Sequence, residues 1–252
     1  MKSLLQSAIS VAVFLGIWEC ISRSGFVSQS LFPPPSAVAT ALVDWGNSGE
    51  LTKDCVSSMW RTLAGLVIGV VIGTLVGITT GRIALLRNIL VPIINLFRPI
   101  PPVAMIPLVI VWVGIGDGSK IASTAFACFF PMFTAAFQGA INLPESFLWA
   151  AQSAGISKTA ILRRIVFPAT LNVALAGLRV SIAMAFVMVF VTELAGASHG
   201  IGYQISLMHL NYRIDRMMAA LAVLAALASL TDFLIIRLLM FACPWIGKER
   251  TV

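Results

Sequence analysis

Six stretches of this chain are apolar over the length that a helix needs to cross a lipid bilayer. A bilayer core of about 30 Å takes about 20 helical residues, and the chain has six such windows, at residues 4–21, 60–80, 88–113, 121–138, 172–191 and 217–241. Of the 252 residues, 59% are apolar and 11% are charged, so a water-soluble fold could not bury this surface. No small-x-small cleavage site follows the first window, which we expect to be retained. The sequence predicts an all-α integral membrane protein with about six transmembrane helices, forming one domain over residues 1–252.

The basic residues mark one side of the predicted membrane protein. The formal net charge is +7, and Lys and Arg gather on the cytoplasmic side of membrane proteins. They lie between the second and third windows, between the fourth and fifth, and at both ends: Arg82, Arg87, Lys158, Arg163, Arg164, Lys2, Lys248 and Arg250. Acidic and basic residues nearly cancel in the other connecting segments. We therefore expect both termini in the cytoplasm and no nucleic-acid partner.

Five glycines follow one face of the second window. They recur at every fourth position, at Gly65, Gly69, Gly73, Gly77 and Gly81, and so lie along one slowly drifting stripe of a helix. Lipid gives helices little hydrophobic drive to associate, and a stripe without side chains lets another backbone approach closely. The stripe predicts close helix packing, either against a helix of the same chain or against a second copy.

The third window contains a cation and several prolines. Arg98, Pro99, Pro101, Pro102 and Pro107 fall inside an otherwise apolar run. Proline removes a backbone donor and interrupts a helix, and interrupted backbone at membrane depth survives only where protein buries it or water lines it. The pattern predicts a translocation pathway or gate, with a purely structural kink as the alternative.

Two arginines are expected near the middle of the membrane. At about 1.5 Å per residue, Arg98 and Arg179 each lie roughly 15 Å from the cytoplasmic end of a straight span. A charged side chain at that depth faces the bundle interior, an acidic partner or a wet cavity. Asp232 is the one deep carboxylate, so it could pair with one arginine. The other would give the pathway a positive potential that suits a small anion.

The segment between the fourth and fifth windows predicts two short helices joined by a hinge. Residues 145–154 favour a helix, Gly155 suits a left-handed stop, Ser157 can cap a second helix and Pro168 is expected to follow its end. The whole cytoplasmic loop covers about residues 139–168. Such a cationic amphipathic segment fits a helix on an anionic membrane surface as well as a docking site for another protein.

The sequence lacks the patterns of an ATP-binding or catalytic site. No G-x-x-x-x-G-K-[ST] motif occurs, and GIGDGSK at residues 114–120 misses its spacing. No spacing singles out a nucleophile for His199 or His209, and His209 and Tyr212 fit interfacial side chains. The four cysteines are scattered singly, so no metal site is expected. We expect a chain that is not an enzyme and that holds no cofactor of its own.

The loop resembles the cytoplasmic EAA loop of binding-protein-dependent ABC importer permeases. That family's pattern runs Glu-Ala-Ala, three residues, Gly, nine residues and Ile-x-Leu-Pro, and the matching positions here are Ala150, Ala151, Gly155, Ile165 and Pro168. Two positions depart from it, because Trp149 stands in place of Glu and Phe167 in place of Leu. The resemblance implies that the loop is a coupling helix seated in a groove of an ATPase subunit, with Ala150, Ala151 and Ala154 expected to share a face that permits close approach.

Three further segments resemble the nitrate, sulfonate, taurine and bicarbonate branch of these permeases: LFPPPSAV, LFRPIPPVAMIPLVIVWVGIGDGSKI and ELAGASHGIGYQI. The resemblance implies the ABC importer permease fold in a bacterial cytoplasmic (inner) membrane, with inward transport of a small solute by alternating access. It implies four kinds of partner: a second permease copy, two ATP-binding subunits that use ATP and Mg, an external substrate-binding protein and the lipid bilayer. The expected cargo is an anion such as nitrate, a sulfonate, taurine or bicarbonate, and relatives that import a pyrimidine-type vitamin precursor share the resemblance.

Two other classes of protein remain as alternatives. A self-contained secondary transporter or channel would move its solute without ATP and would usually carry an inverted repeat, which is not visible in this sequence. A membrane-embedded enzyme would need a catalytic cluster, which the spacing of the polar residues does not indicate.

Overall fold

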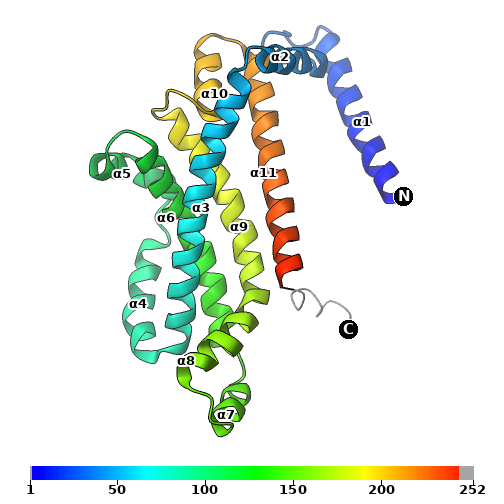
Figure 1. Cartoon of the computed structure of the whole chain (residues 1–252). Coiled ribbons are helices and arrows are strands. Elements are labelled where there is room, and N and C mark those ends of the chain that lie inside the picture. The colour runs from blue at the N-terminus through cyan, green and yellow to red at the C-terminus, as the bar shows by residue number, and fades with distance from the viewer. Residues whose placement is uncertain (1, 244–252) are drawn as a thin grey trace. The chain divides into compact units, whose positions relative to one another are not determined.

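The computed structural model describes residues 2–243, and every regular element in that range is a helix (Figure 1). The long elements are apolar over most of their length, and Gly and Pro separate the short ones. In chain order the helices are α1 Lys2–Arg23, α2 Pro35–Asn47, α3 Glu50–Arg82, α4 Ala84–Phe97, η1 Pro102–Met105, α5 Ile106–Val113, α6 Asp117–Ile141, α7 Glu145–Ser153, α8 Lys158–Ile161, η2 Leu162–Val166, α9 Phe167–Leu194, α10 Ile201–Leu210 and α11 Ile214–Ala242.

Four of these helical stretches are long and apolar enough to cross a membrane, within the part of the chain that the structure describes. They are α3, α6, the continuous stretch Lys158–Leu194 and α11. The pair Ala84–Phe97 and Pro102–Val113 adds a fifth span if the two halves are counted as one. The expected first span lies in α1, which is helical but is not among these four or five, so its crossing of the membrane stays a prediction.

The chain divides into two compact units. The third predicted window, residues 88–113, falls in the larger unit. Unit 1 contains residues 1–58 and 193–226, and unit 2 contains residues 59–192 and 227–252. The expectation of one transmembrane domain over the whole chain stays a prediction.

The glycine stripe of α3 packs against α6 inside unit 2. A Cβ atom added at Gly65 would lie 2.5 Å from the Thr124 Cβ, and one added at Gly77 would lie 2.7 Å from the Phe133 carbonyl oxygen. The intervening and following glycines of the stripe make equally close approaches to the same helix. The two backbones therefore meet along about four helical turns, as small-residue stripes allow in membranes.

Helix α6 is also in close contact with α9 (Figure 1). A Cβ atom added at Gly177 would clash with the Ala135 Cβ and stand 2.9 Å from the Pro131 carbonyl oxygen. Two hydrogen bonds also join α6 to α9, because the Cys128 and Ser181 side chains each donate to the other residue's backbone carbonyl. Helix α6 is thus held between α3 and α9 at the centre of unit 2.

The third predicted window is broken sharply at its prolines. Helix α4 ends at Phe97. The next helical stretch, Pro102–Val113, is bent by 89° from the axis of α4. Pro99, Pro101 and Pro102 have no N–H to continue the helical ladder, so the backbone bonds here are turns, such as Ile100 N–H to the Phe97 carbonyl at 3.1 Å. The interruption that the sequence predicts is present, and its size is a finding of the structure.

The second helix of the predicted loop does not end before Pro168. It runs without a break from Lys158 through η2 into α9, so the expected stop at Pro168 is wrong. Within η2 the helix widens to π geometry, and the Phe167 N–H donates to the Leu162 carbonyl, five residues back. This wider turn accommodates a proline ring, which in an ordinary α-helix would clash with the carbonyl four residues earlier.

Candidate translocation groove and coupling loop

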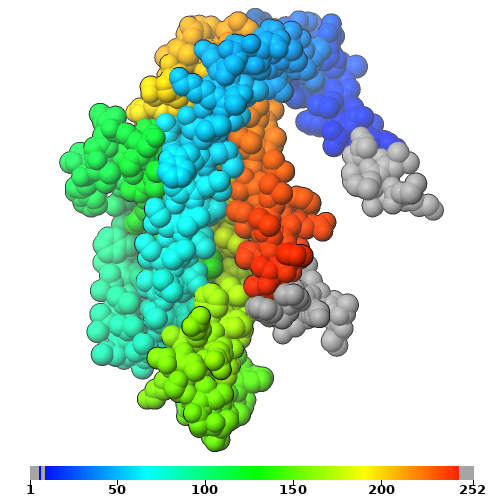
Figure 2. Space-filling model, viewed as in Figure 1, coloured from blue at the N-terminus to red at the C-terminus, as the bar shows by residue number. Residues whose placement is uncertain are grey.

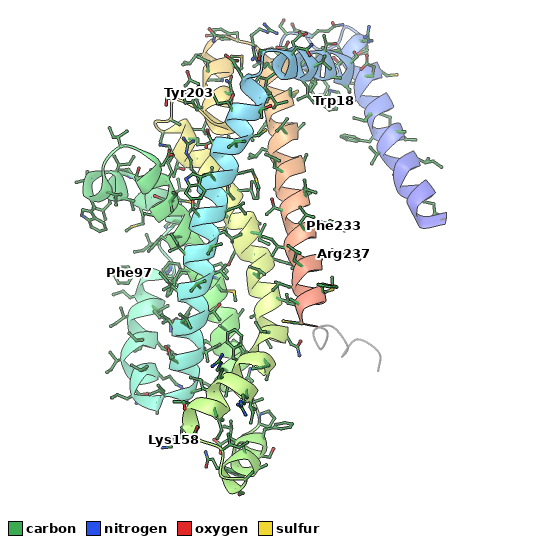
Figure 3. The ribbon with its side chains drawn as sticks, viewed as in Figure 1. Trp18, Phe97, Lys158, Tyr203, Phe233 and Arg237 are labelled. Atoms are coloured by element: carbon green, nitrogen blue, oxygen red, sulfur yellow. The ribbon has the colours of Figure 1, made fainter. Side chains whose placement is uncertain are left out.

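Arg98 lies where α4 ends and the chain turns. Its backbone N–H still donates to the Ile94 carbonyl at 2.9 Å, so Arg98 closes the last turn of α4 before Pro99 interrupts the helix. Its neighbour Phe97 is labelled at this end of α4 in Figure 3. The side chain of Arg98 is exposed to the surroundings of the unit. The break therefore presents a cation at a fixed point of the fold.

A groove of about 560 Å³ in unit 2 has Arg98 as the only charged residue in its lining, among the residues that the structure describes. Thr134 and Gln138 supply the other polar side chains. The apolar lining comes from η1, α6 and α9, namely Pro102, Ala127, Phe130, Pro131, Ala135, Val173, Ala176, Gly177, Val180 and Met184. A guanidinium beside two neutral polar groups and apolar walls can bind an anion that also carries a short organic part.

The helix on the other side of the break packs against protein through one face. Ile106, the first residue of α5, is buried with Ala127 of α6 and Met188 of α9. Interrupted backbone is stable at membrane depth only where protein buries it or where it lines a cavity, and this segment contributes Pro102 to the groove. The arrangement fits a pathway element, although a pathway role for Pro99, Pro101 and Pro102 stays a prediction.

Arg179, the second predicted pathway cation, is placed differently. It is exposed on α9 but is not among the residues that line the groove. Within residues 2–243, no ion pair within 4.0 Å joins Asp232 to Arg98 or to Arg179. Of the two arginines, Arg98 is therefore the better candidate for contact with a cargo.

The depth expected for Arg98 in the membrane stays a prediction, although the span that carries it is not straight. The estimate of roughly 15 Å assumed a straight span, but α4 begins at Ala84 and spans 14 residues, which is about 21 Å of helix axis. The axis then turns by 89°. Arg98 thus lies at the far end of a short helix, a position that apolar windows alone could not reveal.

The predicted coupling loop forms a projecting end of unit 2, seen as the yellow-green α7 and α8 in Figure 2. Trp149 is 62% exposed, and its neighbour Ala150 is exposed as well. Leu148 is only 8% exposed and belongs to a buried cluster that includes Ile78 of α3. Helix α7 thus has an outer face for a partner and an inner face for its own fold.

Ala151 lies on the inner face, which corrects the expected shared surface of three alanines. It is 6% exposed and packs in the same buried cluster, with Ile165 against the cluster's edge. Helical geometry separates adjacent residues by about 100°, so Ala150 and Ala151 face different surroundings. Ala151 therefore fixes the loop to unit 2 instead of meeting a partner.

The hinge has the geometry that its residues predict. Gly155 has a φ of +75°, with nothing within 4 Å of an added Cβ atom. The Ala154 N–H donates to the Ala150 carbonyl, and the Ile156 N–H donates to the Ala151 carbonyl. These two bonds close the end of α7. The Ser157 Oγ accepts from the Ala160 N–H at 3.4 Å and caps α8. A glycine is favoured here because left-handed backbone is costly for other residues.

Two buried carboxylates organise unit 1, and sequence patterns did not single them out. Asp54 accepts from the Gly200 N–H and the Gln204 Nε2, both at 2.8 Å. Glu193 accepts from the Ser58 Oγ and the Gly202 N–H, both at 2.9 Å. Both carboxylates are almost completely buried and hold the N-terminal turn of α10. The only signal in the sequence was that acidic residues stand beside apolar windows. Their hydrogen-bond partners are distant in the chain, so their burial could not be predicted.

In the same unit, polar contacts between α1 and the start of α2 give the segment LFPPPSAV a structural role. Glu19 of α1 accepts from the Ser36 backbone N–H at 3.1 Å and from the Ser36 Oγ at 2.8 Å. Arg23 pairs with the same carboxylate at 2.6 Å, and Pro35 occupies the first turn of α2, where its missing N–H costs nothing. This segment therefore positions α2 against α1 and carries no reactive group.

Within the described residues, no group of three or more His, Cys, Asp or Glu side chains could hold a metal ion. The four cysteines are free, and they do not approach one another as a pair. The long apolar helices, the broken span with its cation-lined groove and the projecting loop are instead features of the membrane-spanning subunit of a transporter.

The chain belongs to the family of binding-protein-dependent transport system inner membrane components, whose model matches residues 65–242. It is therefore the permease subunit of an ATP-driven ABC importer, as the loop and the proline-rich segment indicate. The matched range contains the glycine stripe, the groove and the loop. Membership implies that an ATPase and a binding protein work with this chain.

Several curated relatives resemble the chain over most of its length. The taurine transport system permease protein TauC of Escherichia coli is 31% identical, with 96% of this chain and 90% of that protein covered. The putative aliphatic sulfonates transport permease protein SsuC of Bacillus subtilis is 30% identical, with 92% and 83% covered. The SsuC protein of Escherichia coli is 31% identical, with 86% and 83% covered.

The fold also matches a solved ABC importer. A chain of the MetNI methionine ABC transporter in an inward-facing conformation superposes with a TM-score of 0.59 at 20% identity. The match covers 78% of this chain and 95% of that one. At this identity the similarity establishes the ABC importer permease fold and carries no conclusion about the cargo.

Proposed function

We propose that two copies of this chain form the membrane pathway of an importer for a small organic anion of the sulfonate class. The observation that carries this proposal is Arg98, which has no ion-pair partner among residues 2–243 and is the single charged residue in a groove of about 560 Å³. An isolated cation is costly at membrane depth, and a passing anion offsets part of that cost.

The chemistry of the groove favours a sulfonate over a small inorganic anion. A sulfonate accepts parallel hydrogen bonds from a guanidinium, and Thr134 and Gln138 add neutral polar groups beside it. The walls contributed by residues such as Phe130 and Met184 suit the organic part of the molecule. The relatives named for taurine and aliphatic sulfonates agree with this choice.

The coupling loop is proposed to transmit the conformational change of the ATPase to the membrane-spanning helices. Its outer face presents Trp149, and Gly155 provides a hinge without a side chain. Because the helix continues from Lys158 to Leu194, a displacement of the loop would be passed directly to α9, which lines the groove. Closure of the ATPases would thus open the pathway to a loaded binding protein.

The orientation follows from the distribution of charge. With the cationic loop on the ATPase side, both termini are proposed to be cytoplasmic, in a bacterial inner membrane. ATP and Mg would be used by the two partner subunits, and this chain would not itself hydrolyse ATP. A homodimer would place one Arg98 on each side of a shared pathway.

A transport assay tests the proposed cargo. The permease, its ATPase and its binding protein would be reconstituted in liposomes, and uptake of labelled taurine, an alkanesulfonate, nitrate, bicarbonate and a neutral pyrimidine would be compared. We expect ATP-dependent uptake of a sulfonate. Uptake of the pyrimidine alone would overturn the anion assignment, and uptake at the same rate without ATP would indicate a secondary transporter or channel.

A further inference from the structure

A second cavity of unit 2, apart from the groove, lies beside the coupling loop and is basic. Its volume is about 350 Å³, which is within the range of roughly 300–1,000 Å³ of small-ligand pockets. The lining comes from the end of α3, from α7 and from α8 with η2, namely Thr79, Arg82, Ile83, Leu148, Gln152, Lys158, Thr159, Ile161, Leu162 and Val166. Lys158 is labelled at this end of the unit in Figure 3.

The charges of this cavity have one sign. Arg82 and Lys158 are both cations, and no acidic side chain is among the described residues that line it. Gln152 and Thr159 add neutral hydrogen-bonding groups. Such a set binds an anion with several acceptor oxygens, and phosphate is the commonest group of that kind for Arg and Lys.

Arg82 is already fixed in place. Its Nη1 donates to the Ala140 carbonyl at 3.0 Å, at the end of α6. A guanidinium has five N–H donors, so this bond leaves donors for a ligand while it holds the group still. A held donor loses little freedom on binding. Lys158, the first residue of α8, belongs to the same lining and is exposed.

The apolar part of the lining indicates which kind of phosphate-containing molecule the cavity suits. Five of the lining side chains are aliphatic and stand beside the two cations: Ile83, Leu148, Ile161, Leu162 and Val166. A free phosphate gains nothing from such walls, whereas a phospholipid offers both an anion and an acyl chain. Arg82 is also the last residue of a membrane-crossing helix, which is the level of lipid headgroups.

We propose that this cavity binds the phosphate group of an anionic phospholipid and thereby links the coupling loop to the bilayer. The phosphate lies between Arg82 and Lys158, and the start of an acyl chain follows the aliphatic wall. A basic pocket between helices at the cytoplasmic surface is a known way to recognise anionic lipids. The bound lipid would hold α8 against the end of α3.

Lipid retention by the assembled complex tests this site. The permease with its ATPase would be purified from vesicles of phosphatidylglycerol and phosphatidylcholine, and bound lipid would be counted by native mass spectrometry. We expect selective retention of phosphatidylglycerol and about a 10-fold loss in Lys158→Gln, since one charge-assisted contact is removed. Lys158→Arg should restore retention, because it keeps the charge.

Arg163→Gln is the matched control, since it removes one positive charge from the same loop at a residue outside the cavity lining. Equal retention in Lys158→Gln and in the unmodified chain, or an equal loss in Arg163→Gln, would overturn the site. Displacement of the lipid by millimolar inorganic phosphate would assign the cavity to free phosphate instead. The readout is bound lipid, so its failure would leave the proposed transport function untouched.

Discussion

Gly69 of α3 and Ala125 of α6 lie so close together that a Cβ atom at Gly69 would stand 2.5 Å from the Ala125 carbonyl oxygen. Because that neighbour is backbone and both helices are held along the whole stripe, the clash cannot be relieved by a side-chain rotation. We expect Gly69→Ala to lower the free energy of unfolding by about 1–3 kcal/mol. The thermal midpoint of the purified permease measures this loss.

Gly16→Ala is the control for that prediction. Gly16 lies in α1, where an added Cβ atom meets nothing within 4 Å, so alanine should leave the midpoint unchanged or raise it slightly through its higher helix propensity. If both substitutions had the same effect, the α3–α6 contact would not be the source of the stability.

Trp149→Ala is expected to weaken binding of the ATPase without unfolding the permease. The side chain is 62% exposed on the outer face of α7, and a large aromatic at an interface commonly contributes 2 kcal/mol or more, which is about 30-fold in affinity. Pull-down of the ATPase with detergent-solubilised permease measures the effect, and Gly155→Arg should weaken association as well because its bulk opposes docking.

Two comparisons separate docking from folding at this loop. Leu148→Ala removes a buried side chain of the inner face and should destabilise the permease by about 2–5 kcal/mol. Trp112→Ala removes a similarly exposed aromatic from α5, 69% against 62% for Trp149, and should leave ATPase binding intact. Normal co-purification and transport by both Trp149→Ala and Gly155→Arg would mean that the loop lies on the membrane surface instead.

Asp54→Ala is expected to loosen the start of α10. The substitution leaves the Gly200 N–H and the Gln204 side chain without the carboxylate that both donate to, and unsatisfied buried donors cost about 1–3 kcal/mol each. Hydrogen exchange over residues 200–205 should accelerate at least ten-fold. Exchange unchanged from that in the exposed control Asp44→Ala would show that the buried carboxylate does not hold this turn.

Two native cysteines test the orientation. Cys55 lies near the start of α3 and Cys243 follows α11, and the positive-inside rule places the first outside and the second inside. In variants that keep a single cysteine, an impermeant thiol reagent added to intact cells should label Cys55 only. Labelling of Cys243 without Cys55 would reverse the proposed topology.

Local sequence patterns predicted the elements that depend on local chemistry. The glycine stripe of α3 could be read because side chains four residues apart share a helical face. The hinge could be read because Gly155 is suited to left-handed backbone. The apolar windows predicted the four long apolar stretches and the bent pair of helices around Arg98, within the described residues, because a membrane span must be apolar over its whole length.

Features that depend on distant partners could not be read in the same way. The burial of Ala151 depends on α3 and α6 residues that complete its cluster, and the role of Asp54 depends on Gly200, far along the chain. The stop expected at Pro168 failed because a π turn absorbs the proline. Proline composition predicted a break within the third window but not its angle, and Ile106 beyond the break packs with α6 and α9 residues that are distant in the chain.

The central claim is that Arg98 meets an anionic cargo, and the most direct measurement is the initial rate of sulfonate uptake by the reconstituted importer carrying Arg98→Gln or Arg179→Gln. Glutamine keeps hydrogen-bonding capacity but removes the charge. We expect Arg98→Gln to slow uptake by about 10-fold or more, because a charge-assisted contact is lost, and Arg179→Gln to change it less than about two-fold, with the ATPase still bound in both. Uptake by Arg98→Gln at the unmodified rate would contradict the account.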